Sequence, residues 1–245
     1  MWRVQVMFIY LRLLLAHFIG DFPLQTNYIF KIKLKGIRGV AIHALIVFLA
    51  GLFLSWPYLN LLFTWAFLFF IFITHFIQDA MKIKYSTAKS SFWTYLLDQM
   101  SHVGIISLVF FTSLVDVPDP VFTPNIFAQL YLNNNFIIYC ILMIVATYNG
   151  YFLIRCFHDT FLDRANYNSV EKWYGMIERA TIVLMFIFKR SSLFLVIAPA
   201  LITLRLSFYY FFKNKLTLQN DFASLREILL SWSVAMISSL PLMLF

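Results

Sequence analysis

The sequence predicts an all-α protein, a polytopic transmembrane helical bundle of about seven or eight spans. Its 245 residues are 62% hydrophobic and 12% charged, whereas soluble domains are about 25% charged. Apolar stretches long enough to cross a bilayer recur along the whole chain. Lysine and arginine gather in alternate connections between these stretches, as they do in multi-pass membrane proteins. We therefore expect the lipid bilayer to be the main partner of the protein.

Eight apolar stretches are predicted to be spans. The first leads into the motif HFIGD at 17–21. Because Arg12 interrupts it and no small-residue cleavage site follows, we expect it to be retained rather than cleaved as a signal peptide. The short connection WPY joins the second and third, and the first and sixth are short or interrupted. The predicted ranges are 4–20, 39–56, 58–78, 92–115, 135–156, 173–188, 191–212 and 228–245.

Basic side chains follow the first, third, fifth and seventh spans, whereas the connections after the second and fourth carry none. Because cytoplasmic loops are enriched in Lys and Arg, we expect both termini to be external, in an inner or plasma membrane. The net charge of +8 then reflects topology, and we expect no nucleic-acid partner. Lys189 and Arg190 contradict the pattern and leave a shallow hairpin as an alternative for spans six and seven. The basic residues that follow the first, third, fifth and seventh spans are Lys31, Lys33, Lys35, Arg38, Lys82, Lys84, Lys89, Arg155, Arg164, Lys172, Lys213, Lys215 and Arg226.

The segment 116–134 is predicted to be an external linker between two membrane domains, 1–115 and 135–245. It contains three prolines and most of an asparagine run, and such residues are typical of connections. Cys140 and Cys156 would lie roughly 24 Å apart on one straight helix, so we expect no disulfide between them.

A repeated motif marks the first domain. HFIGD at 17–21 and HFIQD at 75–79 differ in one letter and are offset by 58 residues. The same offset applied to His43 ends one residue before His102. We therefore expect a four-helix domain that arose from a duplicated helical hairpin, and repeats of this kind often enclose a site.

The paired His and Asp residues are predicted to meet at one depth. Residues four apart share a helix face, so each motif presents an imidazole and a carboxylate together. The orientation rule places both motifs, and the reversed pair Asp98 and His102, near the cytoplasmic leaflet. Ionisable groups within membrane segments mark functional sites by default. The candidate metal ligands are His17, Asp21, His43, His75, Asp79, Asp98 and His102.

This set of side chains favours a divalent metal site. Imidazole with carboxylate suits zinc, manganese, iron or nickel better than magnesium, which prefers oxygen alone. Three neighbouring carboxylates also need positive charge, which one or two divalent ions, protonated histidines or basic side chains could supply. An aspartate that is not a ligand could act as general base, and the candidates are Asp21, Asp79 and Asp98. Candidate supporting groups are Gln25, Gln99, Glu178 and Arg179.

The leading hypothesis is a metal-dependent hydrolase that acts on a phosphorylated lipid, another amphiphile or a small molecule. The first alternative is a transporter that moves metal ions or protons through the same residues. The second is a scaffold or accessory subunit, in which the polar residues hold helices together. The sequence indicates no oligomeric state.

Four other polar residues are open to simpler interpretations. His158 and Asp159 are expected to be solvated in the loop after span five. Arg12 either neutralises a carboxylate of the site or reaches the opposite interface. Arg205 is expected to form an ion pair with Glu178, although phosphate is an alternative partner.

The residues above resemble an uncharacterised family of bacterial membrane proteins, domain of unknown function 3307. The resemblance rests on LLLAHFIGDFPLQT at 13–26, His43, ITHFIQDAMKIK at 73–84 and LLDQMSHV at 96–103. The C-terminal half is similar to an extended form of the family through GMIERATIVL at 175–184 and SLREILLS at 224–231, but IAPALITLRL at 197–206 departs from it. The resemblance implies that the candidate ligands, Gln25 and Gln99 belong to a family pattern, and it implies no reaction.

Overall fold

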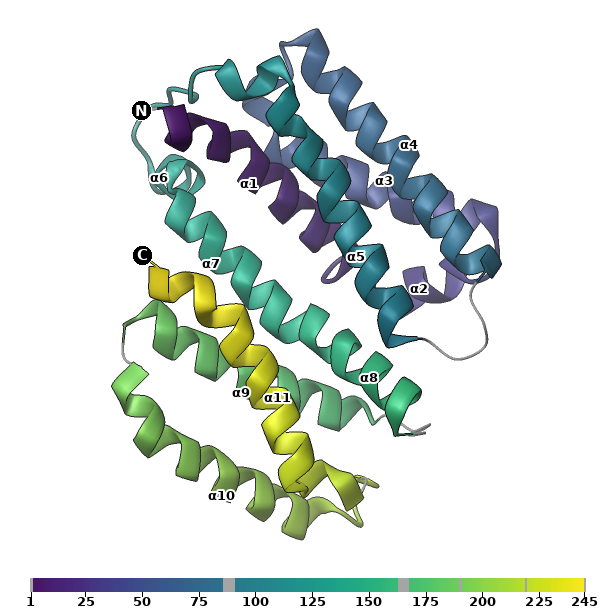
Figure 1. The fold of residues 1–245 in the computed structure, drawn as a ribbon, viewed down its shortest axis with the longest axis vertical. Coiled ribbons are helices and arrows are strands. Elements are labelled where there is room, and N and C mark those ends of the chain that lie inside the picture. Colours follow the sequence, from purple (N-terminus) through teal and green to yellow (C-terminus); the bar gives the residue numbers. More distant parts are fainter. Residues whose placement is uncertain (1, 86–90, 163–167, 190, 219, 245) are drawn as a thin grey trace. The chain divides into compact units, whose positions relative to one another are not determined.

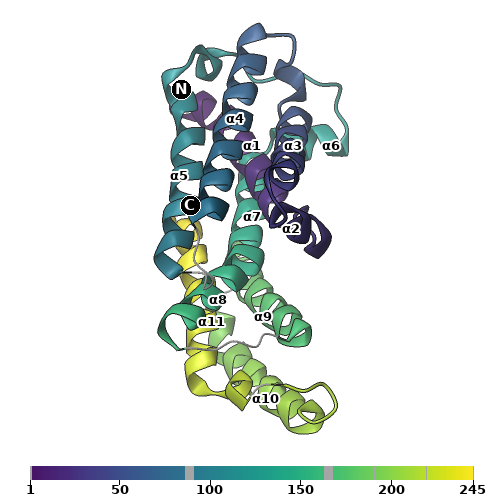
Figure 2. The same cartoon turned by 90° about the vertical axis from the view of Figure 1, so that its right-hand side faces the viewer.

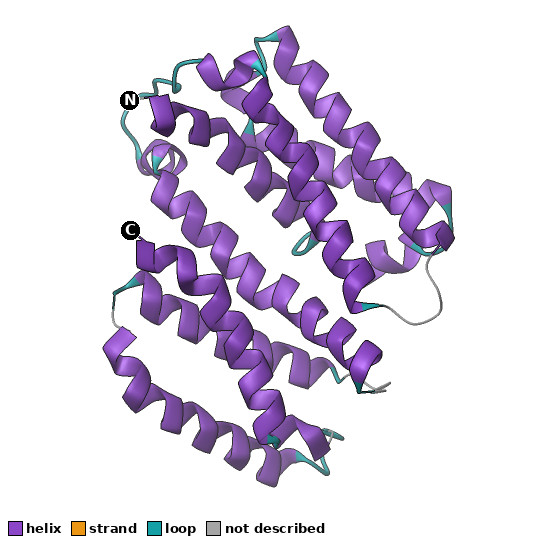
Figure 3. Ribbon diagram, viewed as in Figure 1, coloured by secondary structure: helices purple, strands orange, loops and turns teal. Residues whose placement is uncertain are grey.

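The protein is helical throughout the part of the chain that the structure describes. The computed structural model describes residues 2–85, 91–162, 168–189, 191–218 and 220–244, and none of these lies in a strand (Figure 3). Lys89, Arg164 and Arg190, which contributed to the charge pattern, lie outside these ranges. The chain divides within α7 into two compact units, 1–141 and 142–245. The predicted all-α class is therefore correct.

Five helical segments among the described residues are long and apolar enough to cross a membrane, and a sixth apolar helix at Val196–Phe212 is shorter. The eight predicted spans all fall on segments that are mainly helical. Length and composition therefore indicate a helical membrane protein. The five segments are Ile37–Leu54, Leu62–Tyr85, Phe92–Phe111, Asn134–Phe161 and Leu225–Leu242.

Four long helices form a closed ring in the first unit (Figures 1 and 2). In this ring α1 packs on α3, α3 on α4, α4 on α5, and α5 returns to α1. A short helix, α2, packs on α3 and connects it to α1. The ring thus encloses an interior to which all four helices contribute. The bounds are α1 Trp2–Asp21, α2 Asn27–Lys33, α3 Ile37–Leu54, α4 Leu62–Tyr85 and α5 Phe92–Ser107.

Apolar side chains fill one end of this ring. The buried core there includes Phe8, Leu13, Phe67, Ile106 and Val109. In water, burial of apolar surface contributes about 25 cal/mol per Å² to the free energy of folding. Between helices in lipid this driving force is absent, and close van der Waals packing stabilises the contacts instead. The buried histidines and charged residues of the ring are confined to its other end, apart from Arg12.

Arg12 is fully buried within the apolar end. Its guanidinium donates hydrogen bonds to the carbonyls of Phe8 and Tyr131 and to the side chain of Asn134, and it lies over the ring of Phe8. Tyr131 belongs to α6 (Ile126–Leu132), and Asn134 begins α7 (Asn134–Ile144). Arg12 makes no ion pair with a carboxylate of the described residues. Of its two predicted roles, neutralisation of a site carboxylate is therefore wrong.

The position of α2 depends on a close backbone contact. Thr26 caps this helix, since its Oγ1 accepts a hydrogen bond from the Ile29 N–H at 3.3 Å. Gly36 then turns the chain with φ 135°, a conformation that favours glycine. Gly39 in α3 lies directly against α2, and a Cβ on Gly39 would stand 1.9 Å from the Ile32 carbonyl oxygen. This contact holds the C-terminal end of α2, and with it Lys33, against the first turn of α3.

The second unit is built around α9. The chain continues from α7 through a π-helical segment, Val145–Asn149, into α8. The π segment and α11 both pack on α9, and α10 contacts α9 as well. A small apolar core includes Ile182, Ile228, Trp232 and Ala235. The bounds are α8 Gly150–Phe161, α9 Ser169–Ile187, α10 Phe194–Phe212 and α11 Leu225–Ser239.

Two predictions for this unit have opposite outcomes. Arg205 pairs with Glu178 at 2.8 Å, as predicted. His158 is fully buried in α8, with Nε2 2.9 Å from Oε2 of Glu227, so its predicted place in a solvated loop is wrong. The helix extends through Phe161, and residues four apart share a face, so His158 is buried with Ile154.

Candidate metal centre

Each of the four ring helices contributes one buried histidine at the polar end. These are His17 from α1, His43 from α3, His75 from α4 and His102 from α5, all at most 3% exposed. The His75 and His102 ring centroids are 4.4 Å apart, and His75 lies 5.3 Å from His43 and 5.5 Å from His17. Together with Asp21, Asp79 and Asp98 they are called the His/Asp cluster below.

Asp21 lies between the histidines. Its Oδ1 accepts a hydrogen bond from His43 Nε2 at 3.0 Å and lies 3.3 Å from His75 Nε2. Its Oδ2 lies 3.7 Å from His17 Nε2. Because Asp21 ends α1, its carboxylate reaches both α3 and α4. No lysine pairs with it among the described residues.

Asp79 faces two of the same histidines. Its Oδ2 lies 3.2 Å from His75 Nε2 and 3.5 Å from His43 Nε2. The same oxygen pairs with the Lys33 ammonium at 2.7 Å. Lys33 also donates to Gln25 Oε1 at 3.3 Å, which places the predicted supporting residue Gln25 one contact away from Asp79.

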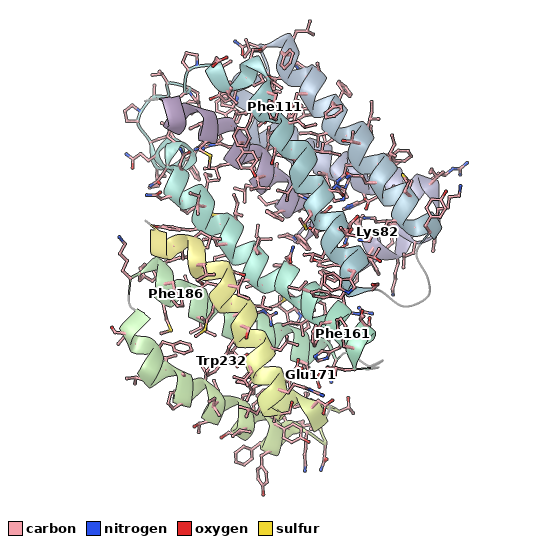
Figure 4. The ribbon with its side chains drawn as sticks, viewed as in Figure 1. Lys82, Phe111, Phe161, Glu171, Phe186 and Trp232 are labelled. Carbon is pink, nitrogen blue, oxygen red and sulfur yellow. The ribbon has the colours of Figure 1, made fainter. Side chains whose placement is uncertain are left out.

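Asp98 occupies the opposite edge of the cluster. Its Oδ1 lies 3.6 Å from His102 Nε2, and its Oδ2 pairs with the Lys82 ammonium at 2.6 Å. Gln99 donates from Nε2 to the same Oδ2 at 3.3 Å. Lys82, labelled in Figure 4, is the more accessible of the two site lysines.

The loop charge pattern predicts only a topological role for Lys33 and Lys82, and it does not predict their contacts in the cluster. Thr26 directly precedes the segment NYIFKIK, which ends with Lys33, so a recognised N-cap would have predicted α2 and its last residue. Lys82 lies three residues after Asp79 on α4, and this spacing places it on the same side of the helix. Lys33 and Lys82 leave one net negative charge on the three carboxylates if the histidines are neutral.

The ligand atoms around Asp21 have spacings that suit a metal ion. Two ligand atoms that each lie about 2.1 Å from a tetrahedral or octahedral ion are about 3.0–3.4 Å apart. Asp21 Oδ1 lies 3.0 Å and 3.3 Å from the Nε2 atoms of His43 and His75. Asp79 Oδ2 lies 3.5 Å and 3.2 Å from the same two atoms. Two imidazoles with one or two carboxylates form a donor set that zinc, iron or manganese accepts.

Two further groups of three ligand atoms lie within 4.8 Å of one another. One consists of His17, His75 and His102, and the other of Asp79, Asp98 and His102. The first lacks a carboxylate, and both carboxylates of the second hold lysines. The group of Asp21, His43 and His75 is therefore the best candidate for binding a cation, since its carboxylate forms no ion pair with a described lysine.

Several imidazole nitrogens in the cluster are buried without a hydrogen-bond partner among the described residues. Both ring nitrogens of His17 and of His75 are in this state, as is His102 Nε2. A buried polar atom that lacks a partner costs about 1–3 kcal/mol, and a bound ligand that contacts these nitrogens would remove that cost. A metal ion, with or without water, fits that requirement.

The remaining predicted supporting residues, Glu178 and Arg179, make their contacts within the second unit. Glu178 pairs with Arg205, and Arg179 donates to the carbonyls of Ala146 and Thr147. Their association with the His/Asp cluster stays a prediction.

The fold and the cluster define a helical membrane protein with a buried polar centre. Residues 9–129 match the model of the family described as "Protein of unknown function (DUF3307)". The chain belongs to this family through its N-terminal half, as its motifs predicted. No curated protein and no solved structure matches the chain. The match ends before the second unit, so the similarity of 175–184 and 224–231 to the extended family stays a prediction.

Proposed function

We propose that the His/Asp cluster binds a divalent metal ion and that the protein is a metal-dependent membrane hydrolase. The observation that carries this proposal is the convergence of four buried imidazoles with Asp21, whose carboxylate no lysine neutralises. One divalent ion would give the cluster a net charge of one plus. Two would leave three positive charges in a buried site, so we propose a single ion.

In this proposal Asp21, His43 and His75 hold the ion, and Asp79 is a fourth candidate ligand. Such an ion lowers the pKa of water and polarises a phosphoryl or acyl oxygen. Asp98, which lies beside His102 and Lys82, is then the carboxylate best suited to hold or accept a proton. Gln25 and Gln99 orient Lys33 and Asp98 respectively.

The substrate class follows from the proposed location. The charge pattern of the loops supports a location of the cluster near the cytoplasmic leaflet, in a proposed topology of about seven or eight spans with both termini external. The four ring helices are proposed to derive from a duplicated hairpin, since α1 and α4 carry the HFIGD and HFIQD motifs. At headgroup depth a phosphorylated lipid or another amphiphile is the expected substrate.

A metal-free structural network is the second candidate, and the two lysine pairs favour it. Lys33 and Lys82 contact Asp79 and Asp98 directly, so these carboxylates are satisfied without a metal. Transport is less well supported, because the other end of the ring is filled by Phe8, Leu13 and further apolar residues. The proposed hydrolase and the structural network differ in metal content.

The Asp21→Asn variant tests metal binding. The substitution preserves shape and some hydrogen bonding but removes the charge that a cation needs. We expect wild-type protein in detergent to contain metal by elemental analysis, and to gain thermal stability with added zinc, manganese or iron as mass action requires. Asp21→Asn should lose both properties. Asp79→Asn is less informative, because it also leaves Lys33 without its carboxylate partner.

Asp119→Asn is the matched control, since it removes one exposed carboxylate outside the cluster. It should retain the metal content and the metal-induced stabilisation of the wild type. Absence of metal and of stabilisation in the wild type, across zinc, manganese, iron, nickel and magnesium, would leave the structural network as the better account.

Single cysteines at Lys35 and Asn133 test the proposed orientation. In a background without Cys140 and Cys156, a membrane-impermeant maleimide should label position 133 in intact cells. It should label position 35 only after the membrane is permeabilised. Labelling of both positions from the same side would remove the argument for a site at the cytoplasmic leaflet.

A further inference from the structure

The second unit contains a cavity of about 40 Å³ beside buried charged side chains. A single water needs roughly 10–15 Å³ on this measure, so the cavity accommodates a small polar group. It lies where α8 ends and α9 begins, and η6 (Asn220–Ala223) and α11 contribute to its wall. Figure 4 labels one of its lining residues, Glu171.

Cationic side chains outnumber acidic ones on the cavity wall. Two of the four cations have carboxylate partners that do not line the cavity: Arg205 pairs with Glu178 at 2.8 Å, and Arg155 lies 4.0 Å from Asp159. Of the two acids, Glu227 contacts the buried His158 at 2.9 Å. The charged lining residues are Arg155, Lys172, Arg179, Arg205, Glu171 and Glu227.

Arg179 is a buried cation whose partners are all neutral. It is 3% exposed and donates to the carbonyl oxygens of Ala146 at 2.7 Å and Thr147 at 3.1 Å, and to Ser231 Oγ at 3.1 Å. Both carbonyls belong to the π-helical segment. Three acceptors leave two of the five guanidinium N–H groups for another partner. Among the described residues, no carboxylate lies within ion-pair distance of Arg179.

The space beside Arg179 depends on a glycine. A Cβ on Gly175 would lie 3.1 Å from one terminal nitrogen of the guanidinium. Gly175 itself lines the cavity one turn before Arg179 on α9. The backbone therefore leaves the arginine open to the cavity.

Lys172 is the second cation without a counter-ion. Its ammonium lies 5.1 Å from the ring centroid of Tyr151 and 5.6 Å from that of Trp173, but no described carboxylate is within ion-pair distance. Lys172 precedes Gly175 by three residues on α9 and lines the same cavity one turn earlier in the helix.

We propose that this cavity binds a phosphate group, with Lys172 and Arg179 as its contacts. Arginine matches the oxygen geometry of phosphate, and buried basic pockets between membrane helices bind phosphorylated headgroups. Glu178 and Glu227 attract the buried guanidinium only from beyond ion-pair distance, so a bound anion would further compensate its burial. The group belongs either to a membrane lipid or to a soluble phosphate. The residues of the cavity belong to the second unit, whereas those of the proposed metal centre belong to the first.

Two probes distinguish the two sources of phosphate on full-length protein in neutral detergent. The first is inorganic phosphate against chloride at equal ionic strength, measured as thermal stabilisation. The second is dioleoylphosphatidylglycerol against the phosphate-free dioleoylglycerol, measured as lipid retained in native mass spectra. Stabilisation by phosphate supports a soluble ligand, and preferential retention of the phosphorylated lipid supports a headgroup.

The Lys172→Gln variant tests the assignment to this cavity. We expect at least fivefold weaker binding of whichever probe the wild type prefers, and restoration by Lys172→Arg. Lys215→Gln, which removes an exposed lysine that does not line the cavity, should bind as the wild type does. Arg179→Gln is avoided as the main test, because it also removes hydrogen bonds to the π segment. The proposal is overturned if the wild type prefers neither phosphate probe, or if Lys172→Gln and Lys215→Gln behave alike.

Discussion

His75→Ala should abolish most metal binding while the apolar packing of the ring persists. His75 Nε2 faces both Asp21 and Asp79, and the imidazole takes part in two of the three potential ligand groups. Even a change in the groups around metal ligands weakens binding about 10–100-fold, so loss of a direct ligand should cost more. Titration of the metal-free protein, followed by calorimetry or a competing chelator, measures the loss.

The stability of the metal-free protein should fall only modestly in this variant. The substitution removes packing contacts, but it also removes two buried nitrogens that lack hydrogen-bond partners among the described residues. We therefore expect a decrease on the order of 1 kcal/mol in the free energy of unfolding. His158→Ala, outside the ring, is the histidine control and should keep the metal. Unchanged metal affinity in His75→Ala would exclude the proposed metal site at Asp21, His43 and His75.

Gly39→Ala should be the most destabilising single methyl addition in the first unit. The new Cβ would stand 1.9 Å from the Ile32 carbonyl oxygen and 2.7 Å from the Lys33 nitrogen, and neither backbone atom can move without displacing α2. Overpacking of this kind costs about 3 kcal/mol or more when backbone must shift. The Lys33–Asp79 pair should be lost with it. Reversible unfolding in mixed micelles measures the stability change, and hydrogen exchange over 27–33 measures the release of α2.

Gly104→Ala is the matched control for Gly39→Ala. A Cβ on Gly104 meets nothing within 4 Å, and the residue is exposed on α5. Alanine is favoured over glycine within helices by about 1 kcal/mol, so this variant should be as stable as the wild type or slightly more stable. Equal stability of the two variants would show that α2 can move away from α3 without loss.

The ring and the convergence of its polar end were predictable because helix geometry operates locally. Spacings of four residues place His17 with Asp21, and His75 with Asp79, whatever the tertiary fold. The loop charges then placed these pairs and His43 at a common depth. Helix spacing and loop charge do not predict the path of the connections between helices. Lys33 enters the cluster through α2, a seven-residue helix in a segment treated as loop.

The second unit illustrates a different difficulty. His158 was assigned to a loop because basic residues follow it, yet α8 continues for three more residues. The sequence spacing did indicate this position, because Ile154 and His158 are four residues apart and would share a helix face. Both residues are buried in the structure. The partner of His158, Glu227, is distant in sequence, so its identity depends on how α11 packs on α8. Such pairings are tertiary facts that composition and periodicity do not specify.

The anchoring of Arg12 determines how much of the chain is needed for the first unit to fold. Its guanidinium is bound by the Tyr131 carbonyl and by Asn134, more than a hundred residues later. Fragments that stop at the end of the family match, residue 129, or at 115 would bury this cation without those partners. A fragment of the unit that folds independently should therefore extend to Ile141, where the compact unit ends. During synthesis the buried arginine of α1 gains its last partner only after Asn134 has emerged, so we expect the packing of α1 to be completed late.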